Sequence, residues 1–179
     1  MAMISVRLND EEVHDYVSGI SVDEVIQNVH GKRSGSVAAI VDGEQRDLSF
    51  LLESNCTVEP ILEDSEDGLY ILRHSCAHLL AQAVTELFPE AKPTIGPPIE
   101  YGFYYDFQMD PIGEEELRQI EKRMKDLAKK NYPIVREELG NDSLREMFSS
   151  NQFKIEIIDD KIGHDVGSSA YRQGEFTDL

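Results

Sequence analysis

Cysteine and basic residues are both scarce in this sequence. Two cysteines, Cys56 and Cys76, occur among 179 residues, which excludes a small secreted domain held together by disulfides. Lysine and arginine number 17 against 35 aspartates and glutamates, for a formal net charge of −18. A free-standing nucleic-acid binder usually carries a basic surplus, so the charge argues against that class. We expect a reduced, acidic protein.

Long hydrophobic runs are missing as well. The compact apolar stretches, such as 37–41, are far shorter than the ~20 residues that span a bilayer. Charged residues begin at Arg7, so no secretory signal is visible. With 40% hydrophobic and 29% charged residues, the composition is that of an ordinary globular protein. We therefore expect a cytoplasmic protein with no membrane contact.

One window departs from the acidic background. Residues 118–136 hold seven basic side chains and only two acidic ones. Such a run is most often the solvated face of a helix. A stripe that contacts phosphates is the sharper alternative.

The first sixty-odd residues follow a pattern of short strands around one helix. Alternating apolar residues predict strands at 4–8 and 13–17, and Ser21 with Glu24 forms a capping box for a helix that ends at Gly31. An apolar strand at 37–41 runs into Asp42-Gly43, a strong hairpin signal. A last strand near 58–62 completes a unit that looks like a ubiquitin-like β-grasp module. The acidic stretch 63–68 is the expected boundary.

Helices and strands alternate in the remainder, so we expect an α+β protein. The pattern predicts long helices at 69–88 and from Glu114 onward, and a short helix capped by Ser143. It predicts strands through 103–107, 134–139, 153–158 and 170–179. Alternation in the strand 153–158 would place Lys154 and Glu156 on its solvent face. Asp178 would then be an ordinary residue near a terminus.

His74 and His78 are the sharpest chemical feature. Four residues apart on a helix, they lie on one face about one turn apart, which suits two ligands of one metal or two groups that handle one substrate. A structural pair explains the spacing equally well. Ser75 stands where the zinc-peptidase motif requires glutamate, and His164 is too loosely placed to be nominated as a further ligand. Cys76 projects to another side of the helix and reads as a small apolar residue.

A stiff loop and an aromatic cluster follow the histidine helix. Gly96 precedes two prolines, so this loop can approach a ligand closely. Phe103 and Phe107 are expected to be core residues. Tyr105 has a polar hydroxyl, so it could lie in the core or in a ligand-binding site.

Several blocks in order resemble the N-terminal region of bacterial-type threonyl-tRNA synthetases. They are Leu72-Arg73-His74-Ser75-Cys76-Ala77-His78-Leu79-Leu80, Ile95-Gly96-Pro97, Gly102-Phe103-Tyr104-Tyr105-Asp106, Glu121-Lys122-Arg123-Met124 and Lys130-Asn131-Tyr132. The resemblance covers essentially the whole chain. It implies a β-grasp TGS domain at 1–63 and an α+β editing domain at 64–179, with a long helix carrying both histidines and antiparallel strands.

In that family the editing domain hydrolyses serine wrongly attached to threonine tRNA. A site that binds threonine's hydroxyl rejects serine weakly, because one missing methyl group is worth only ~1–3 kcal/mol. The resemblance assigns catalysis to His74, His78, Lys154 and Asp178. The histidines would orient water or the terminal ribose, Lys154 would donate to the ester or assist the water, and Asp178 would hold the substrate's amino group or a water.

Substrate selection falls to Gly96 and Tyr105, which the resemblance implies shape the pocket so that threonine's extra methyl group is refused. The family continues after the Asp178-Leu179 position with a Cys-x-x-x-His motif that completes the pocket. We therefore expect weak or absent deacylation by the chain alone, and the residues following Leu179 would be the most informative addition.

The resemblance also implies which partners and cofactors are needed. The substrate is the acceptor end of threonine tRNA bearing a seryl ester, and the other partner is the rest of the synthetase. Editing is expected to need no cofactor, although His74 and His78 could take part in a zinc site, and ATP, magnesium and catalytic zinc belong to the absent synthetic domain. A whole synthetase would be a homodimer and this chain a monomer. The chain alone should bind tRNA poorly because it is so acidic.

Two other functions fit parts of the sequence. A free-standing deacylase for another mischarged tRNA would need its own completed His/His/Cys/His set. A non-catalytic module could use the β-grasp unit to dock RNA or a protein partner. Assaying seryl- against threonyl-tRNA with the chain extended past Leu179 would separate the two classes.

Overall fold

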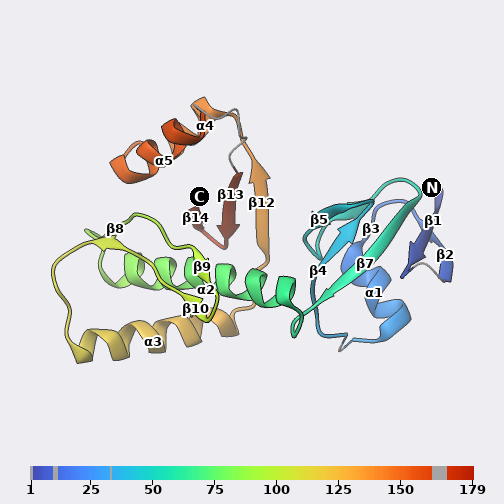
Figure 1. Ribbon diagram of the computed structural model, residues 1–179, viewed down its shortest axis with the longest axis horizontal. Coiled ribbons are helices and arrows are strands. Elements are labelled where there is room, and N and C mark those ends of the chain that lie inside the picture. The colour runs from blue at the N-terminus through green and yellow to red at the C-terminus, as the bar shows by residue number, and fades with distance from the viewer. Residues whose placement is uncertain (1, 10–11, 33, 163–168) are drawn as a thin grey trace. The chain divides into compact units, whose positions relative to one another are not determined.

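The computed structural model describes residues 2–9, 12–32, 34–162 and 169–179, in two compact units (Figure 1). The units are residues 1–72 and 73–179. Both contain helices and strands, so the expected α+β class is confirmed. The division lies nine residues after the boundary expected at residue 63, and the assignment of each part to a named domain stays a prediction.

None of the described helices is both long enough and apolar enough to cross a membrane.

The first unit is a five-stranded sheet packed against one helix. Its elements are β1 (Met3–Leu8), β2 (Glu12–Val17), β3 (Ile20–Ser21), α1 (Val22–His30), β4 (Ser36–Val41), β5 (Glu44–Arg46), β6 (Leu51–Leu52) and β7 (Cys56–Leu62). The strand order is β2-β1-β7-β4-β5, with β1 and β7 parallel and the other neighbours antiparallel. Val22, Val25 and Ile26 of α1 pack with the inward-facing residues of β1 to form the core.

Local signals in this unit act as the sequence predicted. The Ser21 hydroxyl accepts from the Glu24 backbone N–H, and the Glu24 carboxylate accepts from the Ser21 N–H, which is a complete capping box. Gly31 caps the end of α1 with φ 83°. Asp42 and Gly43, between β4 and β5, have φ 49° and 86°, as a type I′ hairpin requires.

A tight turn precedes α2 (Glu66–Leu87). The Ser65 hydroxyl donates to the Leu62 carbonyl at 2.7 Å and accepts from the Gly68 N–H at 3.0 Å. No side chain fits on Gly68, because a Cβ there would lie 1.9 Å from the Leu62 carbonyl oxygen. Glycine is therefore required at this position by close backbone approach.

Replacing Gly68 by alanine should lower the free energy of unfolding of the first unit by about 1–3 kcal/mol, as overpacking against an immovable group does. Urea denaturation followed by circular dichroism measures the loss. The control is Asp67→Ala, an exposed neighbour in the same turn, which should change stability by no more than about 0.5 kcal/mol. Equal effects from both substitutions would show that the turn tolerates a side chain.

The second unit has two helix pairs and a three-stranded sheet between them (Figure 1). After α2 come β8 (Lys92–Pro93), β9 (Pro98–Ile99), β10 (Gly102–Phe103), β11 (Phe107–Gln108), α3 (Glu114–Lys129), β12 (Ile134–Glu138), α4 (Asn141–Met147), α5 (Gln152–Ile162), β13 (Ser169–Gln173) and β14 (Phe176–Asp178). One core joins α2 to α3 through Val84 and Leu127. The other joins α4, α5 and β13 through Leu144, Ile158 and Ala170.

The strand expected at 153–158 is wrong, because these residues lie in helix α5. Asn151 begins the helix: its side-chain oxygen accepts from the Phe153 N–H, and its carbonyl accepts from the Lys154 N–H. Lys154 and Ile158, four residues apart, are buried on one helical face. Lys154 is only 2% exposed, so its expected place on a solvent face is also wrong.

Two smaller expectations also differ. Helix α4 forms where a short helix was expected, but its N-cap is Gly140, and Ser143 lies within the helix. The single strand expected through 103–107 is instead two short strands, β10 and β11, each with its own partner, and residues 104–106 lie between them.

The basic window is largely neutralised by neighbouring carboxylates. Five of its seven basic side chains make ion pairs with acidic residues: Arg118, Arg123, Lys125, Lys129 and Arg136. Most of these pairs join residues three or four apart on α3, which is typical of a solvated helix face. The arrangement favours that interpretation over a phosphate-binding stripe.

Candidate active site

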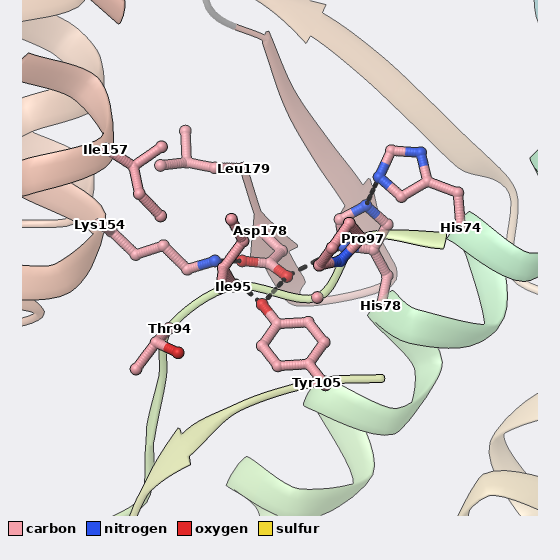
Figure 2. Close-up of a pocket in the computed structure, with 11 residues that line it drawn as sticks. His74, His78, Thr94, Ile95, Pro97, Tyr105, Lys154, Ile157, Asp178 and Leu179 are labelled. Atoms are coloured by element: carbon pink, nitrogen blue, oxygen red, sulfur yellow. Dashed lines mark hydrogen bonds and ion pairs between the residues drawn. The ribbon is translucent and has the colours of Figure 1, made fainter. Parts of the chain in front are cut away.

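A cavity of about 150 Å³ in the second unit is lined by all six residues that the sequence nominated. The lining residues are His74, His78, Thr94, Ile95, Gly96, Pro97, Tyr105, Lys154, Ile157, Asp178 and Leu179. They come from α2, the loop after β8, the segment between β10 and β11, α5, and the end of the chain around β14 (Figure 2).

Helix α2 places both histidines on the face that borders the cavity. His78 is only 6% exposed, and its Nε2 lies 3.1 Å from Nε2 of His74. The rings are tilted by 39° with centroids 4.6 Å apart. The one-turn spacing therefore brings the two imidazoles into direct contact, as the sequence predicted.

Asp178 is the centre of a buried hydrogen-bond network. Its Oδ2 lies 2.9 Å from Nδ1 of His78 and accepts from the Tyr105 hydroxyl at 2.6 Å, and its Oδ1 lies 2.6 Å from Nζ of Lys154. Burial by itself would raise the pKa of the Asp178 carboxyl. The hydrogen bond from His78 and the charge of Lys154 outweigh burial and hold the pKa well below its ordinary value. Asp178 is therefore an ionised acceptor although it is 1% exposed.

Lys154 and Tyr105 complete the network. The Lys154 ammonium donates to the Tyr105 hydroxyl at 2.9 Å, and that hydroxyl donates onward to Asp178. Burial, the charge of Asp178 and the hydrogen bond to it raise the pKa of Tyr105 far above its ordinary value, so the phenol keeps its proton. Figure 2 shows the side chains of His78, Tyr105 and Lys154 meeting at the Asp178 carboxylate.

Gly96 lies directly against the Tyr105 ring. A Cβ on Gly96 would be 2.1 Å from Cδ2 of Tyr105, so this position allows no side chain while the ring stays in place. Backbone hydrogen bonds fasten the loop to the strand segment, from Thr94 N to the Asp106 carbonyl and from Asp106 N to the Ile95 carbonyl, both 2.9 Å. The Tyr105 ring is also stacked on Phe107, with centroids 4.8 Å apart.

Several residues of the site carry no sequence signal. Ile157 and Leu179 form an apolar wall beside Lys154 (Figure 2). Asn151 donates from Nδ2 to the Pro93 carbonyl at 2.7 Å and so ties the start of α5 to the end of β8. Tyr171 packs on both histidines. Helix and strand periodicity in a sequence indicates contacts within one element. These three contacts each join different elements, so periodicity does not predict them.

The described part of the chain does not by itself assemble a full set of metal ligands. Within it, no three His, Cys, Asp or Glu side chains are grouped so that they could hold an ion. His164 lies outside the described residues. Burial raises the pKa of the Cys76 thiol, which disfavours the thiolate that a metal or a nucleophilic role would need.

The arrangement can therefore bind and polarise a small polar group. A buried ammonium and two imidazoles border the cavity next to an ionised carboxylate that fixes them. Donors held in a poorly solvated site stabilise developing negative charge much more strongly than donors in water. An imidazole at the edge of the cavity is a suitable proton acceptor near neutral pH.

Comparison with known proteins relates the whole chain to one kind of enzyme. No protein-family model matches the chain. The threonine–tRNA ligase of Symbiobacterium thermophilum is 40% identical over 182 residues, which cover 99% of this chain and 28% of that protein. The corresponding ligase of Pelobacter propionicus is 43% identical over 183 residues, which cover 100% of this chain and 28% of that ligase. The ligase of Thermoplasma volcanium is 51% identical over 144 residues, which cover 80% of this chain and 22% of that ligase. The chain therefore belongs to the threonine–tRNA ligase family, as a stretch that spans 22–28% of the length of these relatives.

Proposed function

We propose that this chain is the N-terminal editing part of a threonyl-tRNA synthetase and that its cavity hydrolyses serine wrongly attached to threonine tRNA. The observation that carries the proposal is the buried network of His78, Asp178, Tyr105 and Lys154 beside a small cavity. The chain's similarity to threonine–tRNA ligases supplies the substrate class. In this proposal residues 1–63 are the TGS domain and 64–179 the editing domain.

The topology of the first unit supports the β-grasp assignment. Its two central strands, β1 and β7, are parallel and come from opposite ends of the unit, and α1 packs on one face of the sheet. The long helix α2 and the antiparallel strands β12, β13 and β14 likewise match what is expected of the editing domain.

Ester hydrolysis requires an oriented water, a proton acceptor and donors for the oxyanion. The histidine pair supplies the acceptor at the cavity edge, and Lys154 supplies a charged donor toward the ester oxygen. Asp178 accepts three hydrogen bonds from the protein, out of about four acceptor positions on a carboxylate. The position left on Oδ1 would receive the ammonium group of the seryl ester.

The tight packing of the cavity wall supports selection of serine over threonine. Gly96 and Tyr105 touch without a gap, so the wall they form cannot retreat when a substrate carries an extra methyl group. Thr94 and Ile95 continue this wall. A tightly packed wall penalises added volume, which gives the discrimination that the synthetic site lacks.

The test is hydrolysis of seryl- and threonyl-tRNA by a whole threonyl-tRNA synthetase that contains this chain. We expect the seryl ester to be cleaved much faster, and His74→Ala and Lys154→Ala each to slow it about a hundredfold or more, the usual cost of removing a catalytic proton acceptor or donor. The matched control is His30→Ala, an exposed histidine at the end of α1, which should keep the parent rate. Parent-like rates in both site variants would exclude this site as the hydrolytic centre.

A further inference from the structure

Tyr171 contacts both histidines of the cavity. Its ring is stacked on His78, with centroids 5.2 Å apart and planes 28° apart, and meets His74 edge-on at 5.3 Å. The residue lies in β13 and is half-buried. No feature of the sequence pattern marks it, because its contacts join a strand to a helix almost one hundred residues away in the sequence.

The β-ladder explains why Tyr171 and Asp178 act on the same imidazole. They are direct partners in the antiparallel β13–β14 pair, so their side chains project from the same face of the sheet. Asp178 reaches Nδ1 of His78, while the Tyr171 ring covers the face of that imidazole. One hairpin therefore holds His78 both at an edge and over a face.

The hydrogen bonds imply one tautomer for each histidine. Because Asp178 is ionised, Nδ1 of His78 must donate to it. In a neutral imidazole Nε2 of His78 then accepts, so Nε2 of His74 is the donor in the 3.1 Å contact between the rings. His74 is left with Nδ1 as its basic nitrogen. Hydrogen bonds made at the ring edges do not by themselves hold an imidazole plane, because the last side-chain torsion of histidine is broad.

We propose that Tyr171 is a positioning residue, whose ring stacking holds His74 and His78 in the orientation that fixes these two tautomers. Aromatic pairs of this geometry are favourable and directional, which suits them to fix a ring plane. The effect on catalysis rests on the proposed hydrolytic function. The effect on the imidazoles does not, and it is measured without substrate.

The first arm of the test is nitrogen NMR of the histidine rings in the 179-residue chain. We expect the parent to show His78 protonated at Nδ1 and His74 at Nε2. Tyr171→Phe, which keeps the ring, should keep both signatures. Tyr171→Leu, and Tyr171→Ile as a variant better suited to a strand, should show averaged tautomers. Fixed tautomers in the folded Leu or Ile variant would overturn the proposal.

The second arm is seryl-tRNA hydrolysis by the whole synthetase carrying the same substitutions. Tyr171→Phe should stay within about twofold of the parent, whereas Tyr171→Leu should lose about tenfold to a hundredfold in kcat with little change in KM, the cost expected for a misoriented catalytic group. Phe176→Leu, which removes a ring from the neighbouring strand β14, is the control and should match the parent. A Tyr171→Phe enzyme as slow as Tyr171→Leu would overturn the stacking role. A parent that cleaves no seryl-tRNA would refute the proposed function, and the NMR arm alone would then decide the role of Tyr171.

Discussion

Replacing Asp178 by asparagine is expected to lower the free energy of unfolding of the second unit by about 3–5 kcal/mol, because breaking a buried ion pair leaves an uncompensated charge. Lys154, which is 2% exposed, would lose the carboxylate that lies 2.6 Å from its Nζ. The asparagine amide would also present a donor where His78, Tyr105 or Lys154 needs an acceptor. Seryl-tRNA hydrolysis by the whole enzyme should fall by about a hundredfold or more, as expected when a catalytic group loses its orientation.

A double-mutant cycle separates the ion pair from general disruption of the site. Lys154→Met removes the ammonium and keeps a long side chain, and the pair Asp178→Asn with Lys154→Met contains no buried charge at either position. We expect the double variant to be about 1–3 kcal/mol more stable than the sum of the single effects predicts. Urea unfolding, followed by circular dichroism because the chain has no tryptophan, provides the values. Simple additivity would show that Lys154 and Asp178 do not stabilise each other.

Acid titration of stability tests the ionised state of Asp178. Its pKa is lowered in the folded chain, whereas an unfolded aspartate titrates near pH 3.9. The unfolded state therefore binds more protons between these two values, and this contribution to stability is present above about pH 4 and is lost as the pH falls toward the folded-state pKa. Asp178→Asn lacks this contribution. The difference in free energy of unfolding between parent and variant should therefore narrow below about pH 4. A difference that stays constant down to the lowest measurable pH would show that the partners of Asp178 do not lower its pKa.

The parts of the fold that the sequence predicts are those governed by neighbours in the chain. The capping box of Ser21 and Glu24 and the turn at Asp42-Gly43 need only adjacent residues, and both form as expected. Helix α5 shows the opposite case. Phe153, Ile155 and Ile157 alternate like a strand, but the cap at Asn151 and the burial of Ile158 against α4 favour a helix. Packing between elements, which periodicity does not report, decided this segment.

The candidate site divides in the same way. Spacing alone predicts that His74 and His78 meet, because both lie on one helix. Lys154 and Asp178 were nominated through a family resemblance, since pattern alone placed one on a solvent face and the other near a terminus. Their partnership joins a helix to a strand end, and buried charges of this kind become visible only when the elements are packed. Tyr171 and Asn151 were missed for the same reason.

Gly96→Ala is the second substitution with a large expected effect. The new methyl group would lie 2.1 Å from Cδ2 of Tyr105 and 2.6 Å from Cγ and Cε2, so the ring must move. Its movement is restrained at the hydroxyl by Asp178 and Lys154 and over one face by Phe107. We expect a loss of about 1–3 kcal/mol in the free energy of unfolding and about a hundredfold slower seryl-tRNA hydrolysis, because a displacement of about 1 Å costs that much in oriented catalysis.

Two further variants identify the clash as the cause. Gly140→Ala adds a methyl group where no atom lies within 4 Å, so it should leave hydrolysis unchanged. Combining Gly96→Ala with Tyr105→Leu removes the ring that the methyl group meets, and should recover part of the stability but none of the activity, because the hydroxyl between Lys154 and Asp178 is lost. If Gly96→Ala alone kept full activity and stability, the loop would be free to retreat from Tyr105. A retreating loop could not exclude threonine by volume, and selection would then have to depend on polar contacts of the substrate.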